Sequence, residues 1–166
     1  MIIDISSLLH KKSCEVEYDL IPDDVEIILP EGKLDFSKDI LFNFKLQLLN
    51  EIITIVGIIK TQVMLQCSRC AEEFAYDINL DVFEEFTINK DLVDEDIALI
   101  INEKIDISRI VSDNILINLP IAKVCKEGCK GLCHKCGTNL NKEKCDCHNE
   151  EIDDRLKVLQ EFLKLI

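Results

Sequence analysis

The chain has 166 residues, 48% of them hydrophobic, and a net charge of −13, which is enough apolar material for one domain with a real core. Its acidity excludes a protein that coats DNA through general phosphate contacts, because such a protein needs a net positive charge. No apolar run reaches about 18 residues, so no transmembrane helix is expected. The charge order at the N-terminus is wrong for a signal peptide. We therefore expect a cytoplasmic protein.

Alternation of apolar and polar residues predicts short strands near the start of the chain. Residues 16–20 and 25–29 alternate on either side of turn-forming residues at 21–24. A clearer alternation covers residues 42–48, the pattern of a strand with one face buried.

The strand pattern continues beyond a short turn. Asn50 and Glu51 are expected to turn the chain into a β-branched strand over residues 52–65, in which Gly57 suggests a bulge or bend. Residues 74–82 alternate again. Together these patterns predict an antiparallel meander, either as a curved sheet or as a small open barrel.

Helical signals follow the strands. Residues 89–96 are acidic and predict a loop, and residues 97–101 predict one more short strand. A helix should begin at Asp106 or Ser108, because both are good N-cap residues. It should end before Pro120, because the residue preceding a proline disfavours helix.

The predicted fold class is α+β: the β meander or barrel, one helix, a cysteine-rich zinc knuckle and a terminal helix. Apolar residues at helical spacing predict that last helix after residue 153. We expect an acidic β body over residues 1–104 and a helical, cysteine-rich part over residues 105–166, packed as one domain.

Nine cysteines are present, and six of them lie between Cys125 and Cys147. In a reducing cytosol, clustered cysteines bind metal or perform redox chemistry more often than they form disulfides. Residues 123–148 hold six lysines against three acidic residues, a net charge of +3, so the remainder of the chain carries −16. The chain is therefore an acidic body with a basic, cysteine-rich segment.

The primary candidate site is a zinc knuckle built from Cys133, Cys136, Cys145 and Cys147. Cys133 and Cys136 are three positions apart and precede Gly137, which relieves a tight turn around a metal. Cys145 and Cys147 would supply the second pair of thiolate ligands. Four thiolates around Zn²⁺ make a closed site, which is structural rather than catalytic.

Four further cysteines are candidate ligands of a second or alternative metal site, namely Cys125, Cys129, Cys67 and Cys70. The Cys67–Cys70 motif would have to join the later pair across space. His134 and His148 are adjacent to cysteines and are alternative ligands. The sequence leaves open which four side chains bind and how many metals there are.

The cysteines have three other interpretations. A thioredoxin-like motif at Cys67–Cys70 needs a following helix, whereas residues 74–82 have the pattern of a strand. An iron–sulfur cluster also uses four thiolates and stays an alternative to zinc. As a structural corner, the same motif would present Arg69 as an exposed functional group, and Cys14 is expected to be a core thiol.

At these residues the chain resembles the YceD-like family. The resemblance is carried by CSRC at 67–70 and by the run NLPIAKVC…CKGLCHKCGTNLN…CDC from 118 to 147, with support from KIDIS at 104–108 and DDRLKVLQEFL at 153–163. It implies a non-enzymatic ribosome biogenesis factor that supports accumulation or processing of large-subunit (23S) ribosomal RNA.

The expected partners are a precursor large subunit, rRNA or a basic ribosomal protein, with no membrane and no small-molecule substrate. Direct reading of RNA bases is disfavoured, because residues 123–148 contain no Phe, Tyr or Trp for stacking. The acidic body suits a basic protein partner better. The alternatives are a redox or iron–sulfur protein and a zinc-dependent protein-interaction module. Neither a P-loop nor an HExxH motif occurs to support an enzyme.

Overall fold

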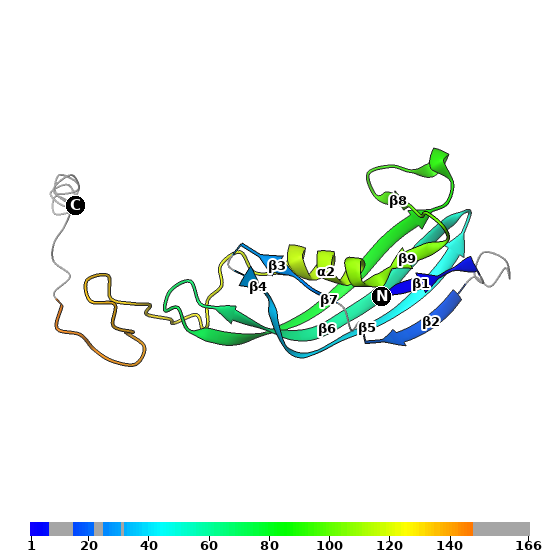
Figure 1. The fold of residues 1–166 in the computed structure, drawn as a ribbon. Coiled ribbons are helices and arrows are strands. Elements are labelled where there is room, and N and C mark those ends of the chain that lie inside the picture. Colours follow the sequence, from blue (N-terminus) through cyan, green and yellow to red (C-terminus); the bar gives the residue numbers. More distant parts are fainter. Residues whose placement is uncertain (7–14, 22–24, 31, 148–166) are drawn as a thin grey trace, which may run out of the picture.

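Three long strands form the centre of the protein (Figure 1). The computed structural model describes residues 1–6, 15–21, 25–30 and 32–147. The main sheet has five strands in the order β2-β5-β6-β7-β8. These strands are β2 (Glu15–Leu20), β5 (Asp35–Leu49), β6 (Ile52–Gln66), β7 (Glu73–Thr87) and β8 (Ile97–Leu99).

The long strands form because their apolar residues recur at every second position. In β5, Phe42, Phe44 and Leu46 are buried while the residues between them are exposed. Asn50 and Glu51 both have positive φ angles, 51° and 66°, which is the backbone of a tight hairpin turn whose twist matches the strands. The predicted turn and the three strands around it are confirmed.

In the part of the chain that the structure describes, one α-helix covers a face of the sheet (Figure 1). Helix α2 (Ile107–Asn118) follows β9 (Lys104–Asp106), which pairs with β1 (Ile2–Asp4). The Asp106 side chain accepts a hydrogen bond from the Arg109 amide and caps the helix, as predicted. The helix face that packs on the sheet is formed by the buried residues Ile107, Ile110, Val111 and Ile115.

The remaining elements are short. Strands β3 (Ile28–Leu29) and β4 (Gly32–Lys33) pair with each other, and the 3-10 helix η1 (Lys90–Leu92) lies in the acidic loop after β7. The predicted strand over residues 25–29 is therefore wrong for its first three positions. The prediction for residues 97–101 is correct only for 97–99.

The antiparallel prediction holds for four of the five strands of the main sheet. Strand β8 pairs parallel to β7, because the acidic loop carries the chain back along the sheet before it pairs. The sheet is therefore mixed. The strand order is linear, so the described strands do not close into a barrel.

Gly57 does not form the predicted bulge. The register passes through it without a shift, from Phe44 on one side to Val82 on the other. A Cβ atom at this position would lie 2.5 Å from the Asn43 carbonyl oxygen and 2.5 Å from the Phe44 Cβ. Glycine is needed here because the neighbouring strand packs closely against it.

Some predictions fall outside the described residues, namely the thiol of Cys14, the turn at 22–24 and the terminal helix after residue 153. Among the described residues, no helix is long and apolar enough to cross a membrane.

Candidate metal centres

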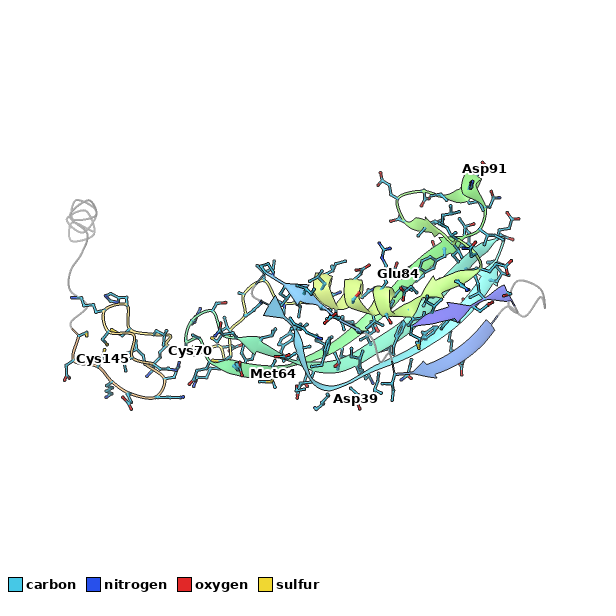
Figure 2. All side chains as sticks on the ribbon, in the orientation of Figure 1. Asp39, Met64, Cys70, Glu84, Asp91 and Cys145 are labelled. Carbon is cyan, nitrogen blue, oxygen red and sulfur yellow. The ribbon has the colours of Figure 1, made fainter. Side chains whose placement is uncertain are left out.

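The turn between β6 and β7 places Cys67 and Cys70 side by side. The Cys67 amide donates to the Glu72 carbonyl at 2.8 Å, and the Ala71 amide donates to the Cys67 carbonyl at 2.8 Å. Ala71 has a φ of 57°, so the turn is tight enough to point both thiols to its inside. Both cysteines are buried, although they lie beyond the last residue of β6 and before the first residue of β7; Cys70 is labelled in Figure 2.

Residues 123–147, which we call the Cys lobe, return to this turn after α2 (Figure 1). The Ser68 amide donates to the Lys123 carbonyl at 2.7 Å, and the Leu132 amide donates to the Arg69 carbonyl at 3.0 Å. The Arg69 guanidinium donates to the Cys129 carbonyl at 3.2 Å. Arg69 is exposed, as the interpretation of a structural corner expects, and its guanidinium binds the backbone of the lobe.

These contacts bring four sulfurs together, and we call Cys67, Cys70, Cys125 and Cys129 the hairpin tetrad. All four sulfur atoms lie within 4.8 Å of one another. The Cys67 and Cys129 sulfurs are 3.9 Å apart, and those of Cys70 and Cys125 are 3.7 Å apart. The tetrad joins two segments separated by more than fifty residues, so a metal bound here would fasten the Cys lobe to the sheet.

Hydrogen-bond donors point at the sulfurs of the hairpin tetrad. The Cys125 amide donates to Cys67 Sγ at 3.4 Å, and the Asn141 side chain donates to Cys129 Sγ at 3.4 Å. Burial alone would raise the pKa of Cys67, but amides of the turn and of Cys125 outweigh it and lower the pKa to about 6. Burial, followed by the neighbouring Cys129 sulfur, raises the pKa of Cys125 to about 12.

The second group, which we call the lobe tetrad, lies entirely within the Cys lobe. Its members are the four cysteines of the predicted primary site, Cys133, Cys136, Cys145 and Cys147, with sulfurs within 4.8 Å of one another. The Gly137 amide donates to the Cys133 carbonyl at 2.8 Å, and the Cys133 amide donates to the Thr138 carbonyl at 2.8 Å. Gly137 has a φ of 74°, the left-handed backbone that the knuckle turn requires.

In the lobe tetrad, as in the hairpin tetrad, one thiol has a lowered pKa and another has a raised pKa. The Thr138 hydroxyl, 3.2 Å from the Cys136 sulfur, is the main cause that lowers the pKa of Cys136 to about 6. The adjacent Cys136 sulfur, followed by burial, raises the pKa of Cys147 to about 12. Without a bound cation, the negative charge of one thiolate makes ionisation of a neighbouring thiol unfavourable.

Both tetrads fit a thiophilic metal. Four sulfurs converge in each, and backbone and side-chain donors can stabilise the charge that thiolates bring. Around a single Zn²⁺, four sulfur ligands would complete a tetrahedral shell and leave no position for a substrate, as in structural zinc sites. The same donor set suits zinc or an iron–sulfur cluster.

The structure divides the predicted site residues into two quartets, and neither histidine joins them among the described residues. His134 is exposed beside the lobe tetrad, and His148 lies outside the described residues. Strand β7 follows Cys70, which is the strand and not the helix that a thioredoxin-like motif needs. Cys129 belongs to a different quartet from Cys133 and Cys136.

Sequence reasoning missed the polar residues that support the tetrads. Asn141 contacts the hairpin tetrad, and Thr138 contacts the lobe tetrad. Both belong to the polar run Thr138-Asn-Leu-Asn141 between two cysteine pairs. Such residues commonly form side-chain-to-backbone turns, which is the signal that could have drawn attention to them.

A mixed sheet with two four-cysteine groups at one end defines a class of small protein with candidate structural metal centres. The family described as "Large ribosomal RNA subunit accumulation protein YceD" matches residues 55–163, and the chain belongs to this family. The matched region contains all eight cysteines of the two tetrads.

Individual relatives cover different shares of the chain. An Arabidopsis thaliana protein, "Large ribosomal RNA subunit accumulation protein YCED homolog 1, chloroplastic", is 32% identical over 58% of this chain, which spans 40% of that relative's length. A Mycobacterium tuberculosis protein is 25% identical over 98% of this chain and 81% of its own length. YlbN of Bacillus subtilis is 28% identical over 81% of this chain and 73% of its own length. No solved structure matches the chain.

Proposed function

We propose that this protein is a non-enzymatic, cytoplasmic ribosome biogenesis factor that supports accumulation or processing of large-subunit (23S) rRNA. The observation that carries the proposal is the family match, which spans both tetrads. Each tetrad supplies four ligands for a metal ion. Because these four sulfurs would occupy every position of a tetrahedral ion, no position remains at which a substrate could react.

We assign Zn²⁺ to both tetrads in a structural role. The Cys lobe needs such support, since within residues 123–147 only Cys129, Gly131 and Cys133 are buried. A segment without an apolar core commonly depends on metal for its fold. When bound, zinc supplies cross-links; the chain's own turn amides, Asn141 and Thr138 orient and stabilise the thiolates.

Metal also changes the charge of the lobe. Each Zn²⁺ with four thiolates carries −2, so two filled sites turn the +3 of residues 123–148, taken together with the thiolates of Cys67 and Cys70, into about −1. A surface of that charge is a weak phosphate binder. A precursor large subunit approached through a basic ribosomal protein therefore suits this chain better than direct contact with rRNA.

The test of the proposal is deletion of the gene in its own host, followed by measurement of the ratio of 23S to 16S rRNA. We expect the ratio to fall, and a plasmid carrying the wild-type gene to restore it. A variant with Cys133→Ser should restore it poorly, whereas Ser68→Ala, an exposed change beside the hairpin tetrad, should restore it fully. An unchanged ratio after deletion would contradict the proposed function.

A further inference from the structure

A groove lies at the end of the sheet opposite the Cys lobe. It is bounded by β8, the end of β7 and helix α2, and its volume is about 420 Å³. Its floor is apolar, formed by the side chains Phe86, Ile100, Ile105 and Ile110. At its edge, Ile101 is 70% exposed and Leu99 is 37% exposed. Large aliphatic side chains left open to water beside a hollow are typical of a surface that binds a partner.

The walls of this groove are acidic. Glu84, Asp106 and Asp113 line it, against Lys104 and Arg109. Residues 84–113, which build the groove and the adjoining loop, contain nine acidic and three basic residues. Figure 2 shows Asp91 in that loop, at the end of the molecule away from Cys70 and Cys145.

The carboxylates are only partly engaged within the chain. Asp113 pairs with Arg109 at 3.5 Å, but both side chains are mostly exposed, and such a surface pair is readily exchanged for another cation. Glu84 accepts a hydrogen bond from the Asn114 amide group, which carries no charge. Asp106 faces the N-terminal ammonium group of Met1 at 3.7 Å. The excess of negative charge beside the groove therefore comes mainly from the adjoining loop, where residues 91–96 hold four carboxylates that a basic ligand would neutralise.

Strand β8 adds a backbone feature to the groove. Among the described strands it pairs only with β7, and it is the last strand of the sheet. An edge strand offers free N–H and C=O groups to an added segment in extended conformation. The occupant that fits the three features is therefore extended, basic and alternately aliphatic.

We propose that the groove between β8 and α2, which we call the acidic groove, binds an extended Lys/Arg-rich segment of a protein, with aliphatic side chains on the apolar floor. This inference rests on the proposed function and names its partner chemistry. Proteins that assemble on rRNA carry segments rich in Lys and Arg, because those residues neutralise phosphates. An acidic groove would hold such a segment before it meets RNA, and would itself repel RNA.

The test uses a fluorescein-labelled peptide, Lys-Val-Lys-Leu-Arg-Val-Lys-Leu-Lys, and the zinc-loaded full chain, with binding followed by anisotropy. Two variants change the groove: Asp113→Lys reverses a wall charge, and Ile101→Ser removes an exposed aliphatic group. Two matched variants, Asp81→Lys and Phe83→Ser, make equivalent changes at exposed positions that line a hollow on the other face of the sheet. Far-UV circular dichroism checks that all four variants fold.

We expect each groove variant to weaken binding by about tenfold, the effect of losing one favourable contact of this kind. The matched variants should stay within about twofold of wild type, since surface changes away from a site have small effects. A peptide with serine at the four aliphatic positions should bind about as weakly as the groove variants. Equal weakening by both pairs, no binding by wild type, or equal affinity for the serine peptide would overturn the assignment.

A cellular readout separates this inference from the proposed function. If deletion lowers the 23S to 16S ratio and the two groove variants restore it fully, the groove assignment fails and the proposed function stands. If deletion leaves the ratio unchanged, the proposed function fails whatever the peptide does.

Discussion

The sheet and the Cys lobe are held together by different forces. Buried apolar side chains fill the space between the sheet and α2, including Phe42, Ile55 and Ile115, which water does not reach. In the Cys lobe, the buried side chains are thiols, and the backbone turns around them. The sheet and α2 are therefore stabilised by the hydrophobic effect, whereas the Cys lobe depends on what its sulfurs bind.

Removal of metal should have the largest effect, and it should affect the two regions differently. Structural zinc contributes about 10–16 kcal/mol to the folding of small zinc-dependent peptides, so a strong chelator should unfold the Cys lobe and leave the sheet. Hydrogen exchange should show loss of protection at the amides of Cys133, Gly137 and Leu140, with β6 still protected. Equal loss of protection in β6 would show that the regions are not independent.

Truncation of the apolar core should have the next largest effect. It should destabilise the sheet and α2 and leave the metal bound in the Cys lobe. Ile115→Ala truncates a fully buried side chain on the sheet-facing side of α2, and should lower the free energy of unfolding by roughly 2–5 kcal/mol. Thermal denaturation measures this, and the bound metal should stay stoichiometric at 25 °C. Ile117→Ala, at an 80% exposed position on the same helix, is the control and should change stability by less than about 0.5 kcal/mol.

Gly57→Ala should destabilise the sheet through overpacking. The added Cβ would meet the Asn43 carbonyl and Phe44 at 2.5 Å, and forcing atoms into a packed site costs about 1–3 kcal/mol. Chemical denaturation followed by circular dichroism gives the value. The control is Gly128→Ala in the Cys lobe, where the added Cβ has no atom within 4 Å, and an equal loss in that variant would contradict the explanation.

Two glycines of the Cys lobe offer a smaller and more local comparison. Gly131 and Gly137 have φ angles of 75° and 74°, so alanine adds backbone strain of about 1–3 kcal/mol at either position. Only at Gly131 would the Cβ also approach the Arg69 carbonyl oxygen, at 3.0 Å. Gly131→Ala should therefore speed metal transfer from the hairpin tetrad to a chromophoric chelator more than Gly137→Ala does. Identical transfer rates in the two variants would show that the close approach of Gly131 to Arg69 does not support the hairpin tetrad.

The central strands and the helix were predictable because their signals are local. Alternation at Phe42, Phe44 and Leu46 defines a strand face, and the spacing of Ile107, Ile110 and Val111 defines a helix face. Capping by Asp106 also depends only on near neighbours.

The rest depends on contacts between distant parts of the chain. The parallel pairing of β8 with β7 is a property of the path of the acidic loop, which has no periodic signal. The need for Gly57 arises from Phe44 on the neighbouring strand. The cysteine spacing indicated the lobe tetrad as one unit. The hairpin tetrad forms because the turn between β6 and β7 lies beside the segment that follows α2, and the spacing of the cysteines alone left this pairing open.

The most direct test of the account is the metal content of the natively purified protein, measured by plasma mass spectrometry for wild type and two variants. We predict two zinc ions per wild-type chain. Cys67→Ser should lose the ion of the hairpin tetrad and Cys133→Ser that of the lobe tetrad, leaving one zinc per chain in each case. Iron in place of zinc, a single ion in the wild type, or loss of both ions from Cys67→Ser would contradict the assignment of two separate structural zinc sites.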